Sequence, residues 1–179
     1  MASSVPASTL EVRRLHSVDD AQLEALADVL IDCVAGGASV SFMLPMTRAK
    51  ALAFWRNVAD GVVRNERVLL VAEDGQGIVG TVQVILAQPE NQPHRADVAK
   101  MLVHRRARRQ GAGAALMRAA EREALAEGKT LLVLDTADDT AARLYARLGW
   151  QAAGTIPRYA LLPAGGECAT TYFYRSLAA

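Results

Sequence analysis

Residues 108–113, Arg-Arg-Gln-Gly-Ala-Gly, constrain this chain more than any other segment. They follow an apolar run at residues 98–103 and lead into an alanine-rich stretch with helical spacing that begins near Ala112. A glycine turn between a strand and a helix leaves several backbone N–H groups unpaired, and the helix dipole adds partial positive charge there. Glycine at positions 111 and 113 lets a ligand approach the backbone without a Cβ in the way. The segment therefore predicts an anion site, and phosphate is the usual anion.

The composition is that of a globular protein. The chain has 179 residues, of which 51% are hydrophobic and 22% are charged, and this length fits one domain over residues 1–179. Residues 1–9 are rich in Ser, Ala and Pro and are expected to form a mobile tail. The net charge of +1 gives no reason to expect nucleic acid or an anionic membrane as partner. No apolar run approaches the roughly 20 residues of a membrane-spanning helix.

Cysteine and histidine usage predicts neither a disulfide nor a metal site. Cys33 and Cys168 match no metal or redox spacing, and Cys33 lies in an apolar helical pattern that predicts a buried thiol. The three histidines form no metal-ligand spacing, so no metal is expected. The N-terminus has no basic start and no apolar core of a signal peptide. A reducing cytoplasm is the expected location.

Hydrophobic periodicity and turn residues divide the chain into alternating strands and helices. Strands are expected at residues 10–15, 68–72, 78–87, 97–103, 131–135, 151–156 and 170–174. Helices are expected from Asp19 or Asp20 to about Ala35, from Thr47 to about Val63, from Ala112 to about Glu127, and from Asp138 or Asp139 to Leu148. This order predicts a mixed α/β domain. Two strand–helix–strand connections near its centre imply parallel neighbours.

Two motifs in this order resemble the GNAT superfamily of acetyl-CoA-dependent N-acetyltransferases. Arg108, Gly111 and Gly113 match the family motif Arg/Gln-x-x-Gly-x-Gly/Ala, between a strand and a helix. Residues 142–150, Ala-Arg-Leu-Tyr-Ala-Arg-Leu-Gly-Trp, are similar to the family's Leu-Tyr-x-x-Leu-Gly-aromatic segment. The resemblance extends over nearly the whole chain. It implies a mixed, mostly antiparallel central sheet with a splayed parallel pair at its centre and helices on both faces.

Shorter segments resemble the tabtoxin-resistance type of acetyltransferase within that superfamily. They are residues 36–40, 95–98, 131–136 and the segment around Tyr145. The resemblance implies direct transfer of an acetyl group from acetyl-CoA to a primary amine of a small molecule, such as a toxin or antibiotic. The protein would act as a monomer or homodimer. A non-catalytic acyl-CoA-binding or sensing module of the same fold is the alternative.

The resemblance also assigns cofactor-binding residues. Backbone N–H groups of the turn would bind the pyrophosphate, and the end of the preceding strand would pair with the pantetheine arm like an added strand. The residues concerned are Leu102, Val103, Arg108, Arg109, Gln110, Gly111, Ala112 and Gly113. Among the arginines at positions 105, 106, 108 and 109, one or two are expected near the cofactor and the others in solvent. No aromatic residues interleave them as stacking on nucleic acid would require.

Tyr145 shares a helical face with Leu144 and Leu148, which is the pattern of a core residue. The resemblance implies a second role, as the general acid that protonates the departing CoA thiolate. With an ordinary pKa of about 10, a tyrosine hydroxyl is protonated at neutral pH and can donate.

Two aspartates are candidates for the base. An alkyl ammonium group has a pKa near 10 and must lose its proton before the amine attacks a thioester. Asp135 ends a buried-looking strand, where open α/β sheets place ligands, and its structural alternative is to cap a helix. Asp97 lies on an otherwise apolar strand face, and its structural alternative is an ion pair with Arg95 or Lys100.

The region after the first helix contributes to the acceptor pocket in the family, which points to Gly37, Ser39 and Phe42. The alternative is a connecting loop whose Phe42 and Met43 cover the core. Residues 128–130, Gly-Lys-Thr, look like the end of a phosphate-binding loop, but they follow a helix and precede a strand, which is the reverse of the required order.

Overall fold

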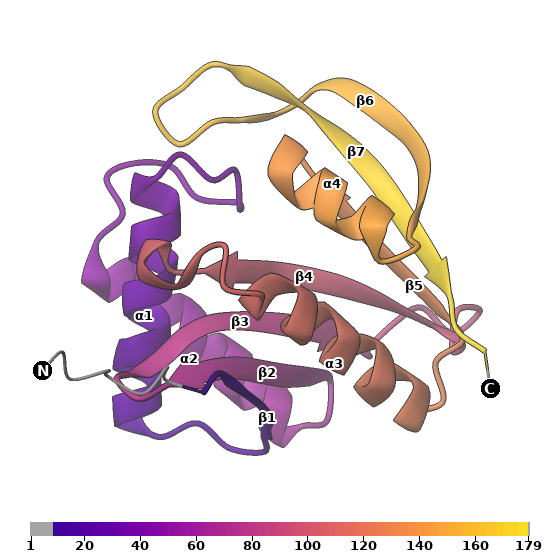
Figure 1. Ribbon diagram of the computed structural model, residues 1–179, viewed down its shortest axis with the longest axis horizontal. Helices are drawn as coiled ribbons and strands as arrows, with labels where there is room; N and C mark the ends of the chain where they lie inside the picture. The colour runs from indigo at the N-terminus through magenta and orange to yellow at the C-terminus, as the bar shows by residue number, and fades with distance from the viewer. Residues whose placement is uncertain (1–8, 179) are drawn as a thin grey trace, which may run out of the picture.

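The computed structural model describes residues 9–178, so the tail expected over residues 1–9 lies outside the described residues except for its last position. Figure 1 shows the arrangement of the elements. In chain order they are β1 (Glu11–Leu15), α1 (Asp20–Ala35), α2 (Arg48–Val63), β2 (Arg67–Asp74), β3 (Gly77–Ile85), β4 (Arg95–Val103), the 3-10 turn η1 (Arg105–Ala107), α3 (Ala112–Ala126), β5 (Leu131–Thr136), α4 (Asp139–Arg147), β6 (Gln151–Leu161) and β7 (Glu167–Ser176).

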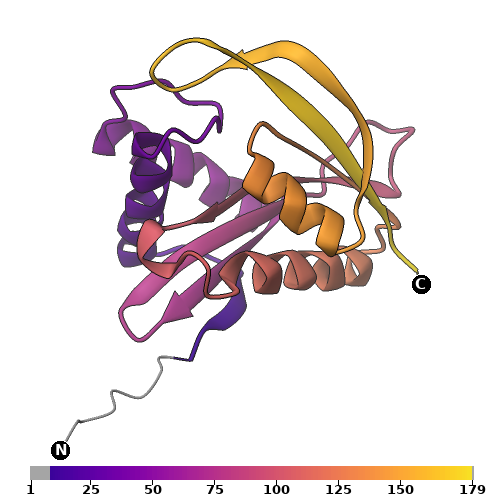
Figure 2. The same ribbon diagram turned by 45° about the horizontal axis from the view of Figure 1, so that its top comes forward.

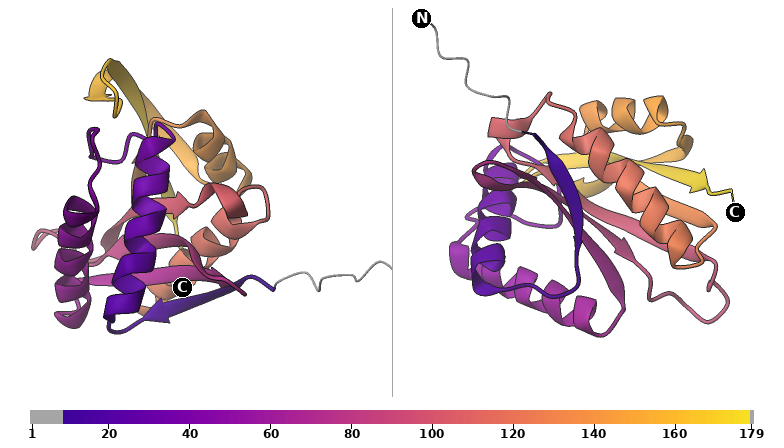
Figure 3. Two further views of the ribbon diagram at one scale, coloured as in Figure 1. Left: turned by 90° about the vertical axis from the view of Figure 1, so that its left-hand side faces the viewer. Right: turned by 60° about the horizontal axis from the view of Figure 1, so that its bottom comes forward.

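The strands form one 7-stranded sheet in the order β1-β2-β3-β4-β5-β7-β6. β4 and β5 are parallel, and the other neighbouring pairs are antiparallel. Figure 3 shows α1 and α2 on one side of the sheet and α3 and α4 on the other. Each side has its own buried apolar cluster, one around Trp55 of α2 and one around Leu116 of α3. The mixed sheet with helices on both faces is as the sequence predicts. Of the two strand–helix–strand connections, the one through α3 joins parallel neighbours, but the one through α4 does not, because β7 lies between β5 and β6.

Local capping explains where the helices begin. Asp19 accepts a hydrogen bond from the Gln22 N–H at 2.8 Å, and the Gln22 side chain accepts one from the Asp19 N–H at 2.9 Å. This reciprocal pair is a capping box. The Thr47 hydroxyl caps α2, and the Asp138 carboxylate caps α4. Of the two aspartates at each expected start, Asp19 caps α1 and Asp138 caps α4, and the expected start at Thr47 is confirmed.

The last two strands are longer than the sequence pattern indicates. β6 was expected over residues 151–156, but it continues through Pro157 to Leu161. Proline is tolerated in an edge strand, where no partner needs its missing N–H. A bulge near Arg158, whose φ is 53°, bends the strand. Figure 2 shows the resulting β6–β7 hairpin arching away from the rest of the sheet. Since most of β6 is exposed on both faces, it shows no alternation that could reveal its length.

Replacing Asp19 by Ala removes the side-chain oxygen that accepts the Gln22 N–H and leaves the backbone N–H that donates to the Gln22 side chain. We expect the free energy of unfolding to fall by about 1 kcal/mol. Urea denaturation measures this loss. Asp20→Ala is the matched control, because it removes a neighbouring carboxylate in the first turn of α1 that makes no cap. If both variants lose the same free energy of unfolding, the stabilisation comes from negative charge near the start of the helix and not from the cap.

Candidate active site

The two parallel strands at the centre of the sheet separate soon after they begin. β4 pairs with β5 only over residues 95–97, opposite residues 131–133. Beyond these positions β4 continues to Val103 along β3, and β5 continues to Thr136 along β7. Figure 1 shows β4 crossing the molecule while β5 rises away from it behind α4. The edges that face this gap therefore carry backbone groups that are available to a ligand.

A bulge in β4 lies in the separated part of the strand. The register with β3 shifts between Thr81 and Gln83. On β4 the same shift falls around Lys100, whose φ of 52° lies in the left-handed region. A bulge adds a residue to one strand and increases its local twist. The bulge therefore contributes to turning the end of β4 away from β5, and nothing in the alternation of the sequence reveals it.

Leu102 and Val103, the two strand positions expected to bind the cofactor, direct their backbone groups to opposite sides of β4. Hydrogen-bonded pairs alternate along an antiparallel ladder. His104 donates its N–H to β3 at 2.8 Å, so Leu102 is the next position directed at β3, and Val103 is directed away from it. The Val103 carbonyl accepts hydrogen bonds from Arg108 Nε at 3.1 Å and Cys33 Sγ at 3.6 Å. Of the two positions, Val103 is the one that turns its backbone groups away from the sheet.

The turn between η1 and α3 has the geometry of an anion site. Arg109 and Gly111 lie in the left-handed region, with φ of 61° and 83°. Gly111 is the N-cap of α3 and offers no side chain to cap it. Within the described part of the chain, none of the backbone N–H groups of residues 109–114 donates a hydrogen bond. The start of α3 therefore presents unpaired donors and the positive end of the helix dipole.

The two glycines of this turn meet different requirements. A Cβ at Gly111 would touch nothing within 4 Å, so glycine is needed there for the left-handed conformation. A Cβ at Gly113 would lie 3.1 Å from Cδ2 of Leu144 in α4. Glycine at 113 therefore allows α4 to approach the start of α3. The sequence pattern suggests glycine at 113 for ligand access, and the packing of α4 gives a second reason for it.

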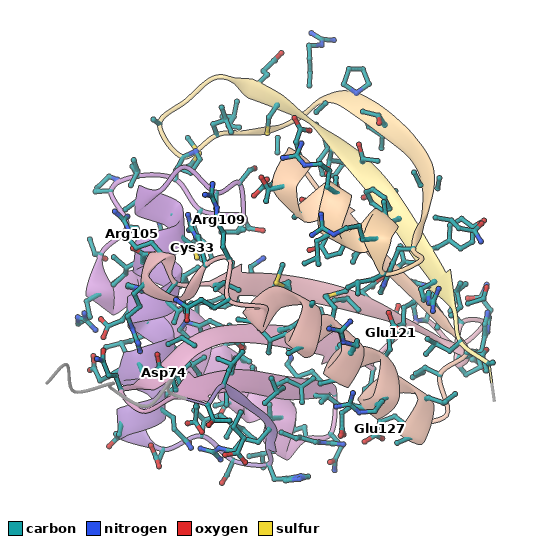
Figure 4. The ribbon with its side chains drawn as sticks, viewed as in Figure 1. Cys33, Asp74, Arg105, Arg109, Glu121 and Glu127 are labelled. Carbon is teal, nitrogen blue, oxygen red and sulfur yellow. The ribbon has the colours of Figure 1, made fainter. Side chains whose placement is uncertain are left out.

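Three of the four arginines around the turn are engaged elsewhere. Arg105 pairs with an acidic residue of α1, and Arg106 pairs with Asp74 at 2.5 Å. The guanidinium of Arg108 donates to the carbonyl at the end of β4. Among the described residues, the guanidinium of Arg109 has no recorded partner. Figure 4 shows Arg109 at the turn before α3 and Arg105 beside α1. Arg109 is therefore the arginine of this group whose charge remains available to a bound anion.

Asp32 of α1 is the acidic residue that holds this region together. Its side chain is only 9% exposed, and its carboxylate accepts a hydrogen bond from the Arg105 N–H at 2.9 Å and another from the Arg105 side chain. His104 Nε2 lies 3.7 Å away. Burial raises the pKa of the Asp32 carboxyl, but the hydrogen bonds from Arg105 outweigh burial, so the pKa lies below its ordinary value. The ionised carboxylate thus ties α1 to the residues that precede the turn.

Tyr145 of α4 is a buried residue with an unpaired hydroxyl. It is 5% exposed, and its ring lies 5.8 Å from that of Phe173 and 6.2 Å from that of Trp150. Within the described residues its hydroxyl makes no recorded hydrogen bond. Burial, followed by the negative charges of Asp138 and Asp135, raises the pKa of Tyr145 well above its ordinary value. The residue is therefore part of the core and also remains protonated, as a proton donor must.

The charge of Asp135 acts on three other ionisable side chains. Asp135 is exposed at the end of β5, opposite Tyr172 of β7, and it accepts a hydrogen bond from the Thr170 hydroxyl at 2.7 Å. Its charge raises the pKa values of Tyr145 and Tyr172 and opposes the lowering of the pKa of Lys100. The alternative that Asp135 caps a helix is wrong, because Asp138 caps α4.

Asp97 has the structural partner that the sequence suggests. Its carboxylate forms an ion pair with Arg95 and accepts a hydrogen bond from Gln88 Nε2 at 3.1 Å. It lies in the part of β4 that is still paired with β5, at the base of the gap. Its charge also contributes to the raised pKa of Tyr172. Of the two carboxylates, Asp135 is thus the more exposed and the one without a cationic partner at ion-pair distance.

The loop after α1 is attached to the β6–β7 hairpin. Ser39 donates a hydrogen bond to the Leu161 carbonyl at 3.3 Å, and the N–H of Leu44 donates to Pro163 at 2.9 Å. Phe42 packs edge-on against Phe54 of α2, with ring centroids 5.2 Å apart. Gly37, the other residue predicted here, has a φ of 93° and makes the turn at the end of α1.

The structure bears out one of the two sequence alternatives for this loop in part. Phe42 is partly buried against the cluster around α1 and α2, as a core-covering connector would be. Met43 is 39% exposed and does not cover the core, so that prediction is wrong. The loop also lies beside the hairpin, as the wall of a pocket would.

Sequence reasoning missed two tyrosines on the hairpin. The hydroxyls of Tyr159 and Tyr172 are 2.8 Å apart, and their rings meet edge to face. The hydrogen bond with Tyr159, together with burial and the charge of Asp135, raises the pKa of Tyr172 to about 12. Only the pairing of β5 with β7 brings Tyr172 to Asp135, so no local sequence signal could have shown it.

The decoy motif at residues 128–130 is structural, as its position in the sequence indicates. Lys129 is 8% exposed, and its Nζ donates to the carbonyls of Leu86 at 3.1 Å and Pro93 at 2.8 Å. Among the described residues there is no group of His, Cys, Asp and Glu side chains that could hold a metal ion. A search of the same residues for a helix long and apolar enough to cross a membrane finds none.

Residues 65–152 match the protein family described as "Acetyltransferase (GNAT) domain". The matched region runs from just before β2 to the start of β6 and includes the gap, the glycine turn and Tyr145.

Solved structures share the whole fold. One is yncA from Salmonella typhimurium with its cofactor acetyl-CoA, at 17% identity and a TM-score of 0.77, covering 96% of both chains. Another is a GNAT superfamily phosphinothricin acetyltransferase from Sinorhizobium meliloti in complex with AcCoA, at 19% identity and a TM-score of 0.78, covering 95% of this chain and 89% of that one. A third is the ribosomal-protein-alanine N-acetyltransferase from Brucella melitensis, at 21% identity and a TM-score of 0.77, covering 93% of this chain and 99% of that one.

Replacing Asp32 by Asn removes the charge that anchors Arg105. We expect the free energy of unfolding at neutral pH to fall by about 1.5–3 kcal/mol, the usual contribution of a hydrogen bond to a charged group. Because the folded pKa of Asp32 is lowered, this stabilisation is complete above its ordinary pKa of 3.8 and is lost as the pH falls below it.

The control is Asp28→Asn in the same helix, where the exposed carboxylate pairs with Arg48. Exposed pairs contribute at most about 1 kcal/mol. Denaturation curves at several pH values compare the two variants. The anchoring role of the ionised carboxylate would be contradicted if the difference in free energy of unfolding between wild type and Asp32→Asn were the same at pH 7 and pH 3.

Proposed function

Because the chain carries a GNAT acetyltransferase domain over residues 65–152 and has the fold of solved GNAT N-acetyltransferases, we propose that it transfers the acetyl group of acetyl-CoA to a primary amine of a small molecule. The observation that carries this proposal is the row of unpaired N–H groups at the start of α3, close to the unpaired edge of β4. An anion site beside a free strand edge suits a cofactor that has a pyrophosphate followed by an amide-containing arm.

The cofactor contacts follow from the same geometry. The N–H groups of residues 109–113 would bind the pyrophosphate, and the free guanidinium of Arg109 would add a charged contact. The N–H of Val103 would pair with the pantetheine arm, because the Val103 carbonyl already accepts hydrogen bonds from Arg108 and Cys33. Leu102 would contribute packing rather than backbone pairing, and Arg108 would hold the strand end in place.

The proposed reaction is a direct attack of the amine nitrogen on the thioester carbonyl carbon. The carbon–sulfur bond breaks, the amine loses a proton and the CoA thiolate gains one. Holding both reactants in the gap would supply orientation, and strand N–H groups would polarise the carbonyl. Tyr145 would donate the proton to the thiolate, since its hydroxyl is protonated and has no other recorded partner among the described residues.

Asp135 is the stronger candidate for the base. It is exposed, its charge acts on Tyr145, and the only hydrogen bond recorded for its carboxylate within the described residues comes from Thr170. It could therefore accept the ammonium proton directly or through water. Asp97 would act with it through the hydrogen-bonded tyrosines or would mainly neutralise Arg95.

The attached loop and hairpin favour a small acceptor. The hydrogen bonds of Ser39 and Leu44 to the hairpin join the two segments beside the aromatic pair of Tyr159 and Tyr172. A joined loop and hairpin leave less room for a protein N-terminus than for a free amine. The resemblance of residues 131–136 to the tabtoxin-resistance type supports the same class, and a toxin or antibiotic amine is the acceptor to test first.

A non-catalytic acyl-CoA-binding module is the alternative function. The unpaired hydroxyl of Tyr145 and the exposed carboxylate of Asp135 favour an enzyme, because a binding module has no need of a proton donor and acceptor beside the gap. Thiol release from acetyl-CoA in the presence of a mixed amine panel separates the two functions. Binding of acetyl-CoA without amine-dependent thiol release would support the module.

Gly111→Asp tests the placement of the cofactor. The substitution puts a side chain and a negative charge where the phosphates are expected, so calorimetry should show that acetyl-CoA binding is largely lost. Gly128→Asp is the matched control, because Gly128 has a similar φ of 77°, an equally open surrounding, and lies at the other end of α3. Undiminished affinity in folded Gly111→Asp protein would refute this placement.

Tyr145→Phe removes the proposed acid and keeps most of the packing. We expect kcat to fall by about 10²–10⁴-fold, the usual contribution of general acid catalysis, with little change in cofactor affinity. Tyr174→Phe is the control, since the Tyr174 hydroxyl only donates to Gln151 on the hairpin. An unchanged kcat in Tyr145→Phe would leave Tyr145 with a packing role alone.

Asp135→Asn tests the base through the pH profile. The rate should fall most at neutral pH and partly recover as the pH approaches the amine pKa of about 10, where free amine becomes abundant. Asp97→Asn should have a smaller effect, and the double variant should show non-additive losses if the carboxylates act together. Wild-type rates and profiles in all three variants, with folding confirmed by circular dichroism, would exclude a carboxylate base.

A further inference from the structure

Lys100 has no part in the chemistry proposed so far, yet it lies beside it. Its Nζ donates a hydrogen bond to the Ser41 hydroxyl at 3.1 Å and lies 5.8 Å from the centroid of the Phe54 ring. Within the described residues Lys100 forms no ion pair. Burial lowers the pKa of its ammonium, and the charge of Asp135 opposes this shift. Lys100 is thus a partly buried cation whose nearest compensating charge is Asp135, beyond ion-pair distance.

Such an arrangement is unfavourable unless a ligand completes it. A buried charge costs free energy when no opposite charge accompanies it. The backbone of Lys100 also lies in the left-handed region, with a φ of 52°, where lysine is uncommon. Residues held in unusual conformations cluster at functional sites. The hydroxyl of Ser41 and the ring of Phe54 are weak partners for an ammonium group compared with an anion.

Lys100 and Asp135 point to the same side of the sheet. Successive side chains of a strand alternate between faces. Leu134, next to Asp135, is buried with α3, so Asp135 lies on the opposite face, toward α1 and α2. The ammonium of Lys100 lies over Phe54 of α2 and is therefore on that face as well. This face carries a cation from β4 and an anion from β5, with the gap between the two strands separating them.

We propose that the acceptor amine also carries a small anionic group, such as a carboxylate, which Lys100 binds while Asp135 receives the ammonium group. This inference rests on the proposed function and names its substrate class as amino-acid-like molecules. The two charges of such an acceptor match the two charges of the site, and the pairing directs the amine toward the carboxylate that takes its proton. Lys100 is then a specificity-determining residue that contacts the substrate and takes no part in proton transfer.

The experiment compares free L-amino acids with their amides, which keep the amine and side chain but lose the negative charge. Thiol release from acetyl-CoA gives kcat/KM for each member of a pair, and the acid-to-amide ratio is compared between enzymes, so that intrinsic differences in amine reactivity cancel. Lys100→Met should lower this ratio by about 10- to 100-fold, as the loss of a charge-assisted hydrogen bond predicts. The change should come from a higher KM for the acid.

Two variants serve as controls. Lys100→Arg keeps the positive charge and should retain most of the acid preference. Lys50→Met removes a lysine that supports the neighbouring loop through the Met43 carbonyl at 3.3 Å, and it should leave the ratio unchanged. Two variants thus test the role of charge at position 100.

A competition experiment on the wild-type enzyme does not depend on the folding of the variants. Carboxylic acids that lack the amine should compete with the acceptor, and their amides should not.

The possible outcomes separate this inference from the proposed function. If amines are acetylated but Lys100→Met lowers acid and amide rates equally, the anion-binding role is wrong and the transferase function stands. Competition by amides as strong as that by acids would also refute it. If no amine of either kind releases thiol, the proposed function fails and this inference fails with it. A selective loss of acid acceptors in Lys100→Met, rescued by Lys100→Arg, confirms it.

Discussion

The separation of β4 from β5 is the constraint on which the rest of this structure depends. Parallel pairing ends after residues 95–97 and 131–133, so the middle of the sheet contains two strand edges without a partner. Unpaired backbone groups are unfavourable unless something else accepts them. The Val103 carbonyl is satisfied by Arg108 and Cys33. A ligand can therefore pair with an edge that would otherwise be closed by the neighbouring strand.

Most of the arginines around the turn before α3 have partners, and the unpaired positive charge lies where a ligand is expected. Asp32 and Asp74 hold Arg105 and Arg106, which leaves the free guanidinium of Arg109 next to the unpaired N–H groups before α3. Acidic partners also fix the geometry of the segment that leads into the turn. The positive potential at the turn thus comes from the backbone, the helix dipole and one arginine, instead of a general basic surface.

The proposed acceptor side is built from segments that are distant in the sequence. The loop after α1 joins the β6–β7 hairpin through Ser39 and Leu44, and β7 brings Tyr172 opposite Asp135. This hairpin extends an edge of the sheet that no helix covers along most of β6, as Figure 2 shows. The hairpin is thus held mainly by the loop after α1 and by β5, whereas the glycine turn is held by the packing of α3 against α4.

The sequence by itself determined the order of the elements and the glycine turn, and it narrowed the caps of α1 and α4 to two aspartates each, because these features depend on local backbone preferences and short-range hydrogen bonds. The tertiary structure alone decided which arginine stays free, that the charge of Asp135 acts on Tyr145, and that Lys100 lies at a bulge in β4. Those features arise from strand register and from contacts between remote segments. A pattern read along one strand carries no information about the residue that lies opposite it.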